Sequence, residues 1–101
     1  AAGAEVDLRP ELAAWSPNLA SPLLSTALRV WRDCRGEEAH ARATHGGLEC
    51  SLIRQTYPGL DMISIGPSIR FPHSPDEAVH IASVGRFMKC VRTLVEELGK
   101  A

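Results

Sequence analysis

The chain has 101 residues, of which 45% are hydrophobic, 23% charged and 5% aromatic. This composition is typical of one soluble globular domain and excludes a disordered, collagen-like or membrane-spanning chain. The net charge of −1 and the scattered basic residues argue against binding to nucleic acid or to an anionic membrane. The first residues lack the features of a signal peptide, and three widely spaced cysteines are typical of reduced thiols in the cytosol.

Two elements are predicted in the first third of the chain. Residues 4–9 alternate apolar and polar side chains with a period of two, which predicts a short strand. Ser21 can cap a helix, and Pro22 suits the first helical position, where its missing N–H is not needed. Apolar residues then recur at helical spacing, so we expect a helix over residues 22–35 that ends at Gly36 in a left-handed cap.

The rest of the chain predicts two strands, two helices and a loop. Residues 39–43 alternate again and favour a short strand, and a helix is expected over residues 47–56. Residues 61–65 are mostly apolar and predict a buried strand, followed by a proline-rich loop over residues 66–76. One apolar stripe at helical spacing predicts a last helix over residues 83–98.

The alternation of strands and helices predicts the α/β fold class. A sheet of three short strands would leave its edges open, and the first strand has no neighbour in sequence with which to pair. We therefore interpret the chain as a piece of a larger protein.

The densest group of chemically active side chains lies at His73, Asp76 and Glu77. His73 stands between two prolines, in a stiff loop after the buried strand, which is where α/β proteins place their sites. A neutral imidazole is a common metal ligand, and a nearby carboxylate can fix its tautomer. The alternative from the residues alone is a polar surface loop with solvated carboxylates, and His80 is interpreted as a loop or strand histidine.

A second group comprises His45, Gly46, Gly47, Glu49 and Cys50. Two glycines before a helix expose backbone N–H groups and allow a substrate to approach closely. From the residues alone, a tight turn from strand to helix explains this pattern better. Cys50 lacks the base, orienting group and oxyanion donors that a nucleophilic cysteine needs, so we do not assign it a catalytic role.

Several motifs together resemble one enzyme family. They are Thr44 to Ser51 (THGGLECS), Asp61 to Ile69 (DMISIGPSI), Pro72 to Glu77 (PHSPDE) and His80-Ile81-x-Ser83-Val84, with Trp15-Ser16-Pro17-Asn18 and Ser21-Pro22 ahead of them. In this order they resemble the C-terminal end of the aminoacyl-histidine dipeptidases, also called Xaa-His or carnosine-type dipeptidases. The resemblance covers nearly the whole chain and is weakest over residues 1–14.

The resemblance implies part of a two-zinc metallopeptidase. The family has a two-layer or three-layer α/β catalytic domain, with a mixed sheet and helices, and an inserted lid domain. Residues 1–14 would correspond to the end of the lid, including its last strand, and residues 15–101 to the C-terminal part of the catalytic domain.

The same resemblance implies roles for individual residues. The histidine of the family's H-S-P-D-E motif is a zinc ligand and corresponds to His73. Independently of the resemblance, we expect Asp76 or Glu77 to orient this loop from beside the ligand. The segment bordering the substrate pocket corresponds to His45, Gly47 and Glu49. The family's other metal ligands, its bridging aspartate and its glutamate general base belong to the N-terminal half, so we expect no catalytic residue in this chain.

We therefore expect a parent enzyme that hydrolyses Xaa-His dipeptides with zinc in the cytoplasm, and a 101-residue chain that is inactive alone. Its expected partners are the missing N-terminal half of the same polypeptide, a dipeptide substrate and a second copy of the enzyme. Two alternatives remain at this point. One is another amide hydrolase of the same superfamily, of aminoacylase or tripeptidase type, and the other is a non-enzymatic interaction module.

Overall fold

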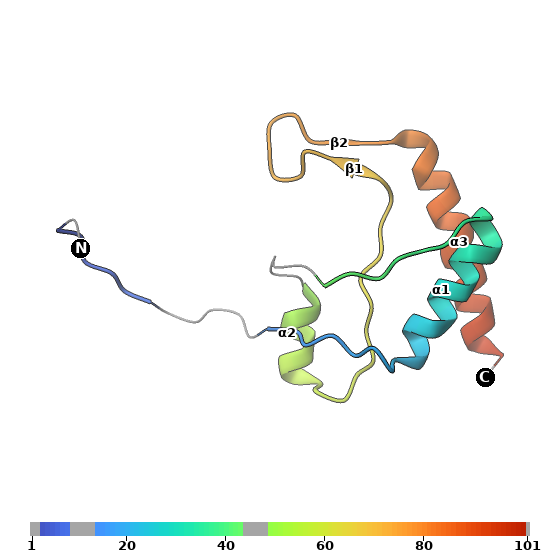
Figure 1. Cartoon of the computed structure of the whole chain (residues 1–101), viewed down its shortest axis with the longest axis horizontal. Helices are drawn as coiled ribbons and strands as arrows, with labels where there is room; N and C mark the ends of the chain where they lie inside the picture. Colours follow the sequence, from blue (N-terminus) through green and yellow to red (C-terminus); the bar gives the residue numbers. More distant parts are fainter. Residues whose placement is uncertain (1–2, 9–13, 44–48, 101) are drawn as a thin grey trace.

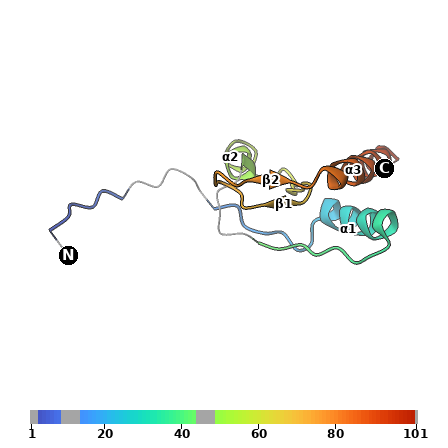
Figure 2. The ribbon, with the colours of Figure 1, turned by 90° about the horizontal axis from the view of Figure 1, so that it is seen from above.

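The computed structural model describes residues 3–8, 14–43 and 49–100. Three helices and a two-stranded antiparallel sheet follow one another along the described chain (Figure 1). They are α1 (Pro22–Arg35), α2 (Glu49–Thr56), β1 (Ile69–Arg70), β2 (Ala78–Val79) and α3 (Ile81–Gly99). Seen from above, α1 and α3 lie side by side, and the strands extend away from the first turn of α3 (Figure 2).

Helix α1 begins and ends where local signals predict. The Ser21 hydroxyl oxygen accepts a hydrogen bond from the N–H of Leu24 at 2.9 Å, and Pro22 occupies the first turn. At the other end Gly36 adopts a φ of 70°, and its N–H donates to the carbonyl of Arg32 at 2.8 Å. Only a residue without Cβ adopts this left-handed conformation at little cost, so the glycine stops the helix.

A second group caps the same helix from far along the chain. The Ser21 hydroxyl donates to Asp61 Oδ1 at 2.6 Å, and the N–H of Leu23 donates to Asp61 Oδ2 at 3.1 Å. A carboxylate at a helix N-terminus accepts otherwise unpaired N–H groups and interacts favourably with the helix dipole. Asp61 therefore fixes the segment after α2 against the start of α1.

We expect replacement of Asp61 by alanine to lower the free energy of unfolding by about 1–2 kcal/mol, because two hydrogen bonds to a charged acceptor are lost. Urea unfolding followed by circular dichroism measures the change. Asp33→Ala is the matched control, since among the described residues its carboxylate pairs with the exposed side chain of the adjacent Arg32 alone. Equal losses in the two variants would contradict a capping role for Asp61.

The core lies between α1 and α3. Ala27 and Val30 on α1 and Leu94 on α3 are buried, and Trp31, Cys34 and Ile63 pack against them. The rings of Trp31 and Phe87 meet edge to face, with their centroids 6.1 Å apart. At the rim, Arg29 pairs with Glu97 at 3.3 Å across the two helices. Hydrogen bonds from Lys100 and Arg29 hold the pKa of Glu97 below its usual value, so this carboxylate is charged at neutral pH.

A second face of α3, next to the one that packs on α1, is apolar and largely open to solvent. It carries Val84, Met88, Val91, Val95 and Leu98, which alternate spacings of four and three residues along one side of the helix. Met88 is 56% exposed and Val95 is 63% exposed. In contrast, Cys90 and Leu94, on the side that faces α1, are buried. The single apolar stripe predicted from the sequence is therefore two faces, of which only one is packed.

The whole chain is open in shape. Its radius of gyration is 17.3 Å, whereas a compact chain of this length has one of about 13 Å. Its accessible surface is 8465 Å², against about 5,600 Å² for a compact monomer of this mass. The small core and the large exposed apolar area have the character of one part of a larger core.

The strands differ from those predicted. Residues 4–8 and 39–43 form no strand, and neither do residues 61–65; residue 9 lies outside the described residues. A strand requires a hydrogen-bonded neighbour, which alternation of side chains does not supply. Val6 and Leu8 are exposed, so no packed surface selects the alternating pattern there, whereas Ile63 covers the core between α1 and α3.

The observed strands lie instead within and just after the predicted proline-rich loop. Ile69 pairs with Val79 and Arg70 with Ala78, so the chain folds back on itself around residues 71–77. The helix predictions are closer. The first is confirmed with its bounds, the last begins two residues early, and the second runs from Glu49, its predicted residues 47 and 48 lying outside the described chain. Among the described residues no helix is both long and apolar enough to cross a membrane.

Candidate functional site

The candidate site is the connection between β1 and β2, residues 71–77, which carries His73. Hydrogen bonds centred on Ser74 close this loop. The Ser74 hydroxyl donates to the carbonyl of Phe71 at 2.7 Å and accepts from the N–H of Asp76 at 3.2 Å. The carbonyl of Ser74 accepts from the N–H of Glu77 at 3.1 Å. One serine therefore fixes both ends of the loop, and the backbone around His73 has little freedom.

Two residues of the loop occupy a backbone conformation that side chains rarely adopt. Phe71 has a φ of 52° and His73 a φ of 64°, both in the left-handed region. For residues with a Cβ this region costs roughly 1–2 kcal/mol each, and neither residue is a glycine or an asparagine. Such conformations persist where surrounding interactions enforce them, and they concentrate at ligand-binding positions.

The loop is tied to the start of α3. The N–H of His80 donates to the carbonyl of Ser68 at 2.9 Å, and the N–H of Ser68 donates to the hydroxyl of Ser83 at 3.0 Å. Ser83 is buried, and its hydroxyl also donates to the carbonyl of His80 at 2.6 Å. Nδ1 of His80 accepts from the N–H of Ser83 at 3.2 Å, so His80 caps the helix. The base of the hairpin that carries His73 is thus tied to a helix that is itself anchored in the core.

The predicted carboxylates take different positions in the loop. Glu77 Oε1 accepts the backbone N–H of His73 at 3.4 Å, so this side chain reaches back across the loop. Asp76 contributes its own N–H to Ser74, and its side chain is exposed to solvent. Of the residues predicted to border a substrate, Glu49 is exposed at the first position of α2, and His45 and Gly47 lie outside the described residues.

The chemistry of this loop suits one metal ligand and no more. His73 is exposed, and its rigid backbone presents the imidazole to solvent at low entropic cost. Within residues 3–8, 14–43 and 49–100, however, no three histidine, cysteine, aspartate or glutamate side chains gather closely enough to hold a metal ion. A catalytic zinc usually takes three protein ligands. The described residues can therefore supply no more than part of such a ligand set.

Sequence reasoning missed the capping roles of His80 and Asp61 and the buried position of Ser83. The signal for His80 was available, because a polar residue precedes the apolar stripe of α3 and a serine follows three positions later, at the spacing of a helix cap. No such signal was available for Asp61, because its hydrogen-bond partners lie some 40 residues earlier in the chain. Local patterns do not reveal such contacts.

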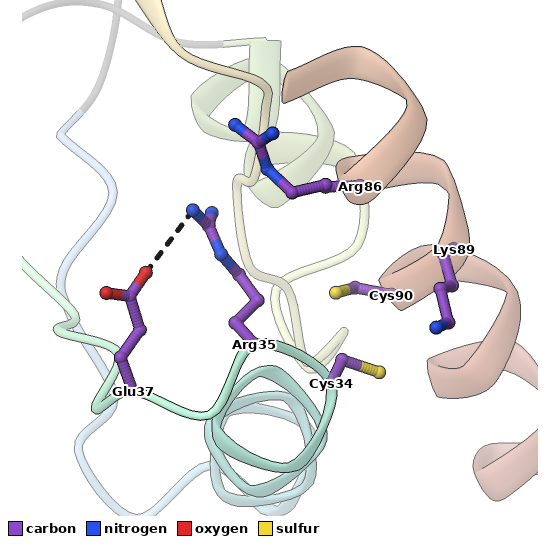
Figure 3. A pocket seen from close by; sticks show the side chains of 6 residues that line it. All are labelled: Cys34, Arg35, Glu37, Arg86, Lys89 and Cys90. Carbon is purple, nitrogen blue, oxygen red and sulfur yellow. Dashed lines mark ion pairs between the residues drawn. The ribbon is translucent and has the colours of Figure 1, made fainter. Parts of the chain in front are cut away.

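Away from the loop, one cavity of about 340 Å³ lies between α1 and α3 (Figure 3). It is lined by Cys34, Arg35, Glu37, Arg86, Lys89 and Cys90. Arg35 is paired with Glu37 at 3.3 Å, which leaves Arg86 and Lys89 as uncompensated cations at this cavity among the described side chains. It shares no residue with the candidate site.

The chain and its fold are similar to segments of two known dipeptidases. No family model matches the chain. Over 97 residues, 96% of the chain, it is 37% identical to the cytosol non-specific dipeptidase of Escherichia coli strain K12, of which it covers 20%. Its structure matches that of the aminoacylhistidine dipeptidase from Vibrio alginolyticus with a TM-score of 0.74 and 37% identity, over 82% of this chain and 17% of that one.

These two matches confirm the resemblance to the aminoacyl-histidine dipeptidases that the sequence motifs predicted. They also confirm the fold class, because helices with a small antiparallel sheet match part of such an enzyme. The chain spans about a fifth of the length of the relatives that it matches, and both relatives are named as dipeptidases.

Proposed function

We propose that this chain is the C-terminal part of a zinc-dependent dipeptidase that hydrolyses Xaa-His dipeptides, and that His73 binds zinc. The observation that carries the proposal is the conformation of the loop. An exposed imidazole stands on a left-handed backbone that Ser74 and Glu77 hold in place. This backbone conformation makes folding less favourable, and it provides no compensating stabilisation within the described chain. Two dipeptidase relatives support the assignment.

Zinc, when bound, polarises a peptide carbonyl and lowers the pKa of water. The residues of this chain contribute to that chemistry by positioning one metal ligand. His73 donates one nitrogen, and Glu77 holds the backbone of His73 and so restricts the direction of the ring. Asp76 belongs to the same loop and would add negative charge to the surroundings of a bound metal. The general base and the remaining ligands belong to the preceding part of the polypeptide, so the 101-residue chain alone is inactive.

The proposal also assigns the remaining segments. Residues 1–14 form the end of the lid, and residues 15–101 belong to the catalytic domain. His45, Gly47 and Glu49 border the substrate, next to the start of α2. The exposed apolar face of α3 packs against the preceding part of the same polypeptide, since the relatives are about five times longer than the region they share with this chain. The complete enzyme is a cytosolic homo-oligomer.

Replacement of His73 by alanine tests the zinc assignment in the polypeptide encoded by the complete reading frame. We expect bound zinc to fall and kcat/KM for a β-alanyl-histidine substrate to drop about 100-fold or more, because a metal ligand is lost. Bound metal is measured by atomic emission after dialysis. His40→Ala is the matched control, since His40 is also an exposed histidine and lies in an irregular segment.

Each outcome separates one element of the proposal. Zinc content and hydrolysis near wild-type levels in the His73 variant would show that His73 is not a ligand. Cleavage of N-acylated amino acids in place of Xaa-His dipeptides would keep the metal and correct the substrate. A reading frame that encodes only these 101 residues would remove the enzyme and favour a stand-alone interaction module.

A further inference from the structure

The cavity between α1 and α3 contains two of the three cysteines of the chain, Cys34 and Cys90. They come from different helices, and both side chains project into the space between them (Figure 3). The two helices pack directly on each other, and Cys34 and Leu94 contribute to the same core cluster. The two thiols are therefore neighbours in the fold although 56 positions separate them in the sequence.

We propose that Cys34 and Cys90 form a redox-active pair, which a small anionic disulfide oxidises to a cross-link between α1 and α3. The two thiols differ in access, and this difference sets the order of the steps. Cys34 is half-buried, whereas Cys90 is 1% exposed. A disulfide in solution can therefore reach Cys34 first, and Cys90 acts as the internal resolving thiol.

The cations around the cavity favour a negatively charged oxidant. Arg35, Arg86 and Lys89 line it, and Glu37 is the only carboxylate among the lining residues. A net positive wall raises the local concentration of negatively charged molecules and speeds their encounter. Glutathione disulfide, which carries several carboxylates, has the required charge and chemistry.

The exchange balances without any further reactant. The thiolate of Cys34 attacks one sulfur of the small disulfide, whose S–S bond breaks, and the released thiolate takes up the proton lost by Cys34. Cys90 then loses its proton and attacks the sulfur of Cys34. A second small thiolate leaves with the electron pair and takes up that proton. The protein pair is oxidised by two electrons, and the small disulfide is reduced to two thiols.

The electrostatics of Cys90 agree with its place as the second thiol. Burial, and then the neighbouring Cys34, raise the pKa of the Cys90 thiol above its ordinary value, while Arg35 and Lys89 act in the opposite direction. Cys90 is therefore protonated at neutral pH and does not compete for the first attack. Once Cys34 carries a mixed disulfide, attack by Cys90 is intramolecular and needs no access from solvent.

Glutathione disulfide added to the reduced 101-residue chain tests the proposal. The free thiol titre should fall from three to one. Trypsin digestion without reductant should yield peptides 33–35 and 90–92 joined, lighter than the two free peptides by two hydrogen atoms. The cross-link should also raise Tm by about 10 °C, because it closes a long loop of the unfolded chain. The polypeptide from the complete reading frame is assayed in parallel.

Three controls make the result specific to the fold. Cys50→Ser, on α2, should form the same cross-link as the wild type, whereas Cys34→Ser should form none. In concentrated urea the preference should pass to the pair Cys34 and Cys50, because the shorter loop closes more readily in an unfolded chain. Circular dichroism of the reduced protein confirms that helices are present before the oxidant is added.

Two kinds of result would contradict the proposal. A folded Cys50→Ser variant that yields only glutathione adducts, or that keeps both thiols free, would show that Cys34 and Cys90 are not a pair. For the oxidant, the anionic glutathione disulfide should react several-fold faster than the cationic cystamine, and Arg86→Gln should reduce that ratio. Equal rates for both disulfides would reject the role of the cationic wall.

Discussion

We expect replacement of Leu94 by alanine to lower the free energy of unfolding of the chain by about 3 kcal/mol. Leu94 is 5% exposed and lies in the centre of the contact between α1 and α3, so the shorter side chain loses buried apolar contact and leaves a cavity. Few other buried apolar residues in the described chain can compensate. Urea unfolding followed by circular dichroism at 222 nm, a wavelength that reports helix content, measures the loss.

Leu98→Ala is the matched control, because it makes the same change one turn later at a side chain that is 42% exposed. We expect a loss of about 1 kcal/mol or less there, since much of the leucine remains in contact with water in the folded chain. A larger loss for Leu98 than for Leu94 would place the core on the other face of α3 and contradict the packing described above.

We expect the second large effect on the free energy of unfolding from a substitution that introduces a charge on the exposed face of α3. The size of this effect should depend on the length of the polypeptide. In the 101-residue chain, we expect Val95→Glu to change the free energy of unfolding by only about 0.5 kcal/mol, because Val95 is 63% exposed. In the polypeptide from the complete reading frame, the same substitution costs about 3 kcal/mol or more if this face is covered, because a carboxylate then loses its water without gaining a partner.

The comparison uses the difference between the two lengths of polypeptide, and so the intrinsic effect of the substitution cancels. Arg92→Glu, on the polar side of the same helix, is the control that changes charge without changing an apolar residue. Unfolding midpoints of both variants in both polypeptides supply the measurement. Similar losses from Val95→Glu at the two lengths would show that the preceding polypeptide does not cover α3.

The helices could be predicted because their signals are local. Ser21, Pro22 and Gly36 mark both ends of α1 within the sequence of the helix itself, and the structure has the helix within those bounds. For α3 the apolar stripe predicts the helix, but not which of its apolar side chains are packed. That division depends on α1, whose position relative to α3 is set by tertiary contacts such as those of Leu94.

The strands and part of the candidate site depend on contacts that no local pattern contains. Residues 61–65 have the composition of a buried strand, yet Asp61 caps α1 and Ile63 covers its core. The hairpin of β1 and β2 depends on Ser83, a residue in the next helix. His73 could be singled out by its neighbours and by the family resemblance, while its left-handed backbone became visible only in the structure.

The hydrogen bonds that join Ser68, His80 and Ser83 fix the base of the hairpin to the first turn of α3, so the hairpin moves with that helix. His73 lies at the far end of the hairpin. A small rotation of α3 on α1 is therefore amplified into a larger displacement of the imidazole of His73. Side chains deep between the two helices, such as Val30 and Leu94, thus influence the position of His73, although they lie outside its loop.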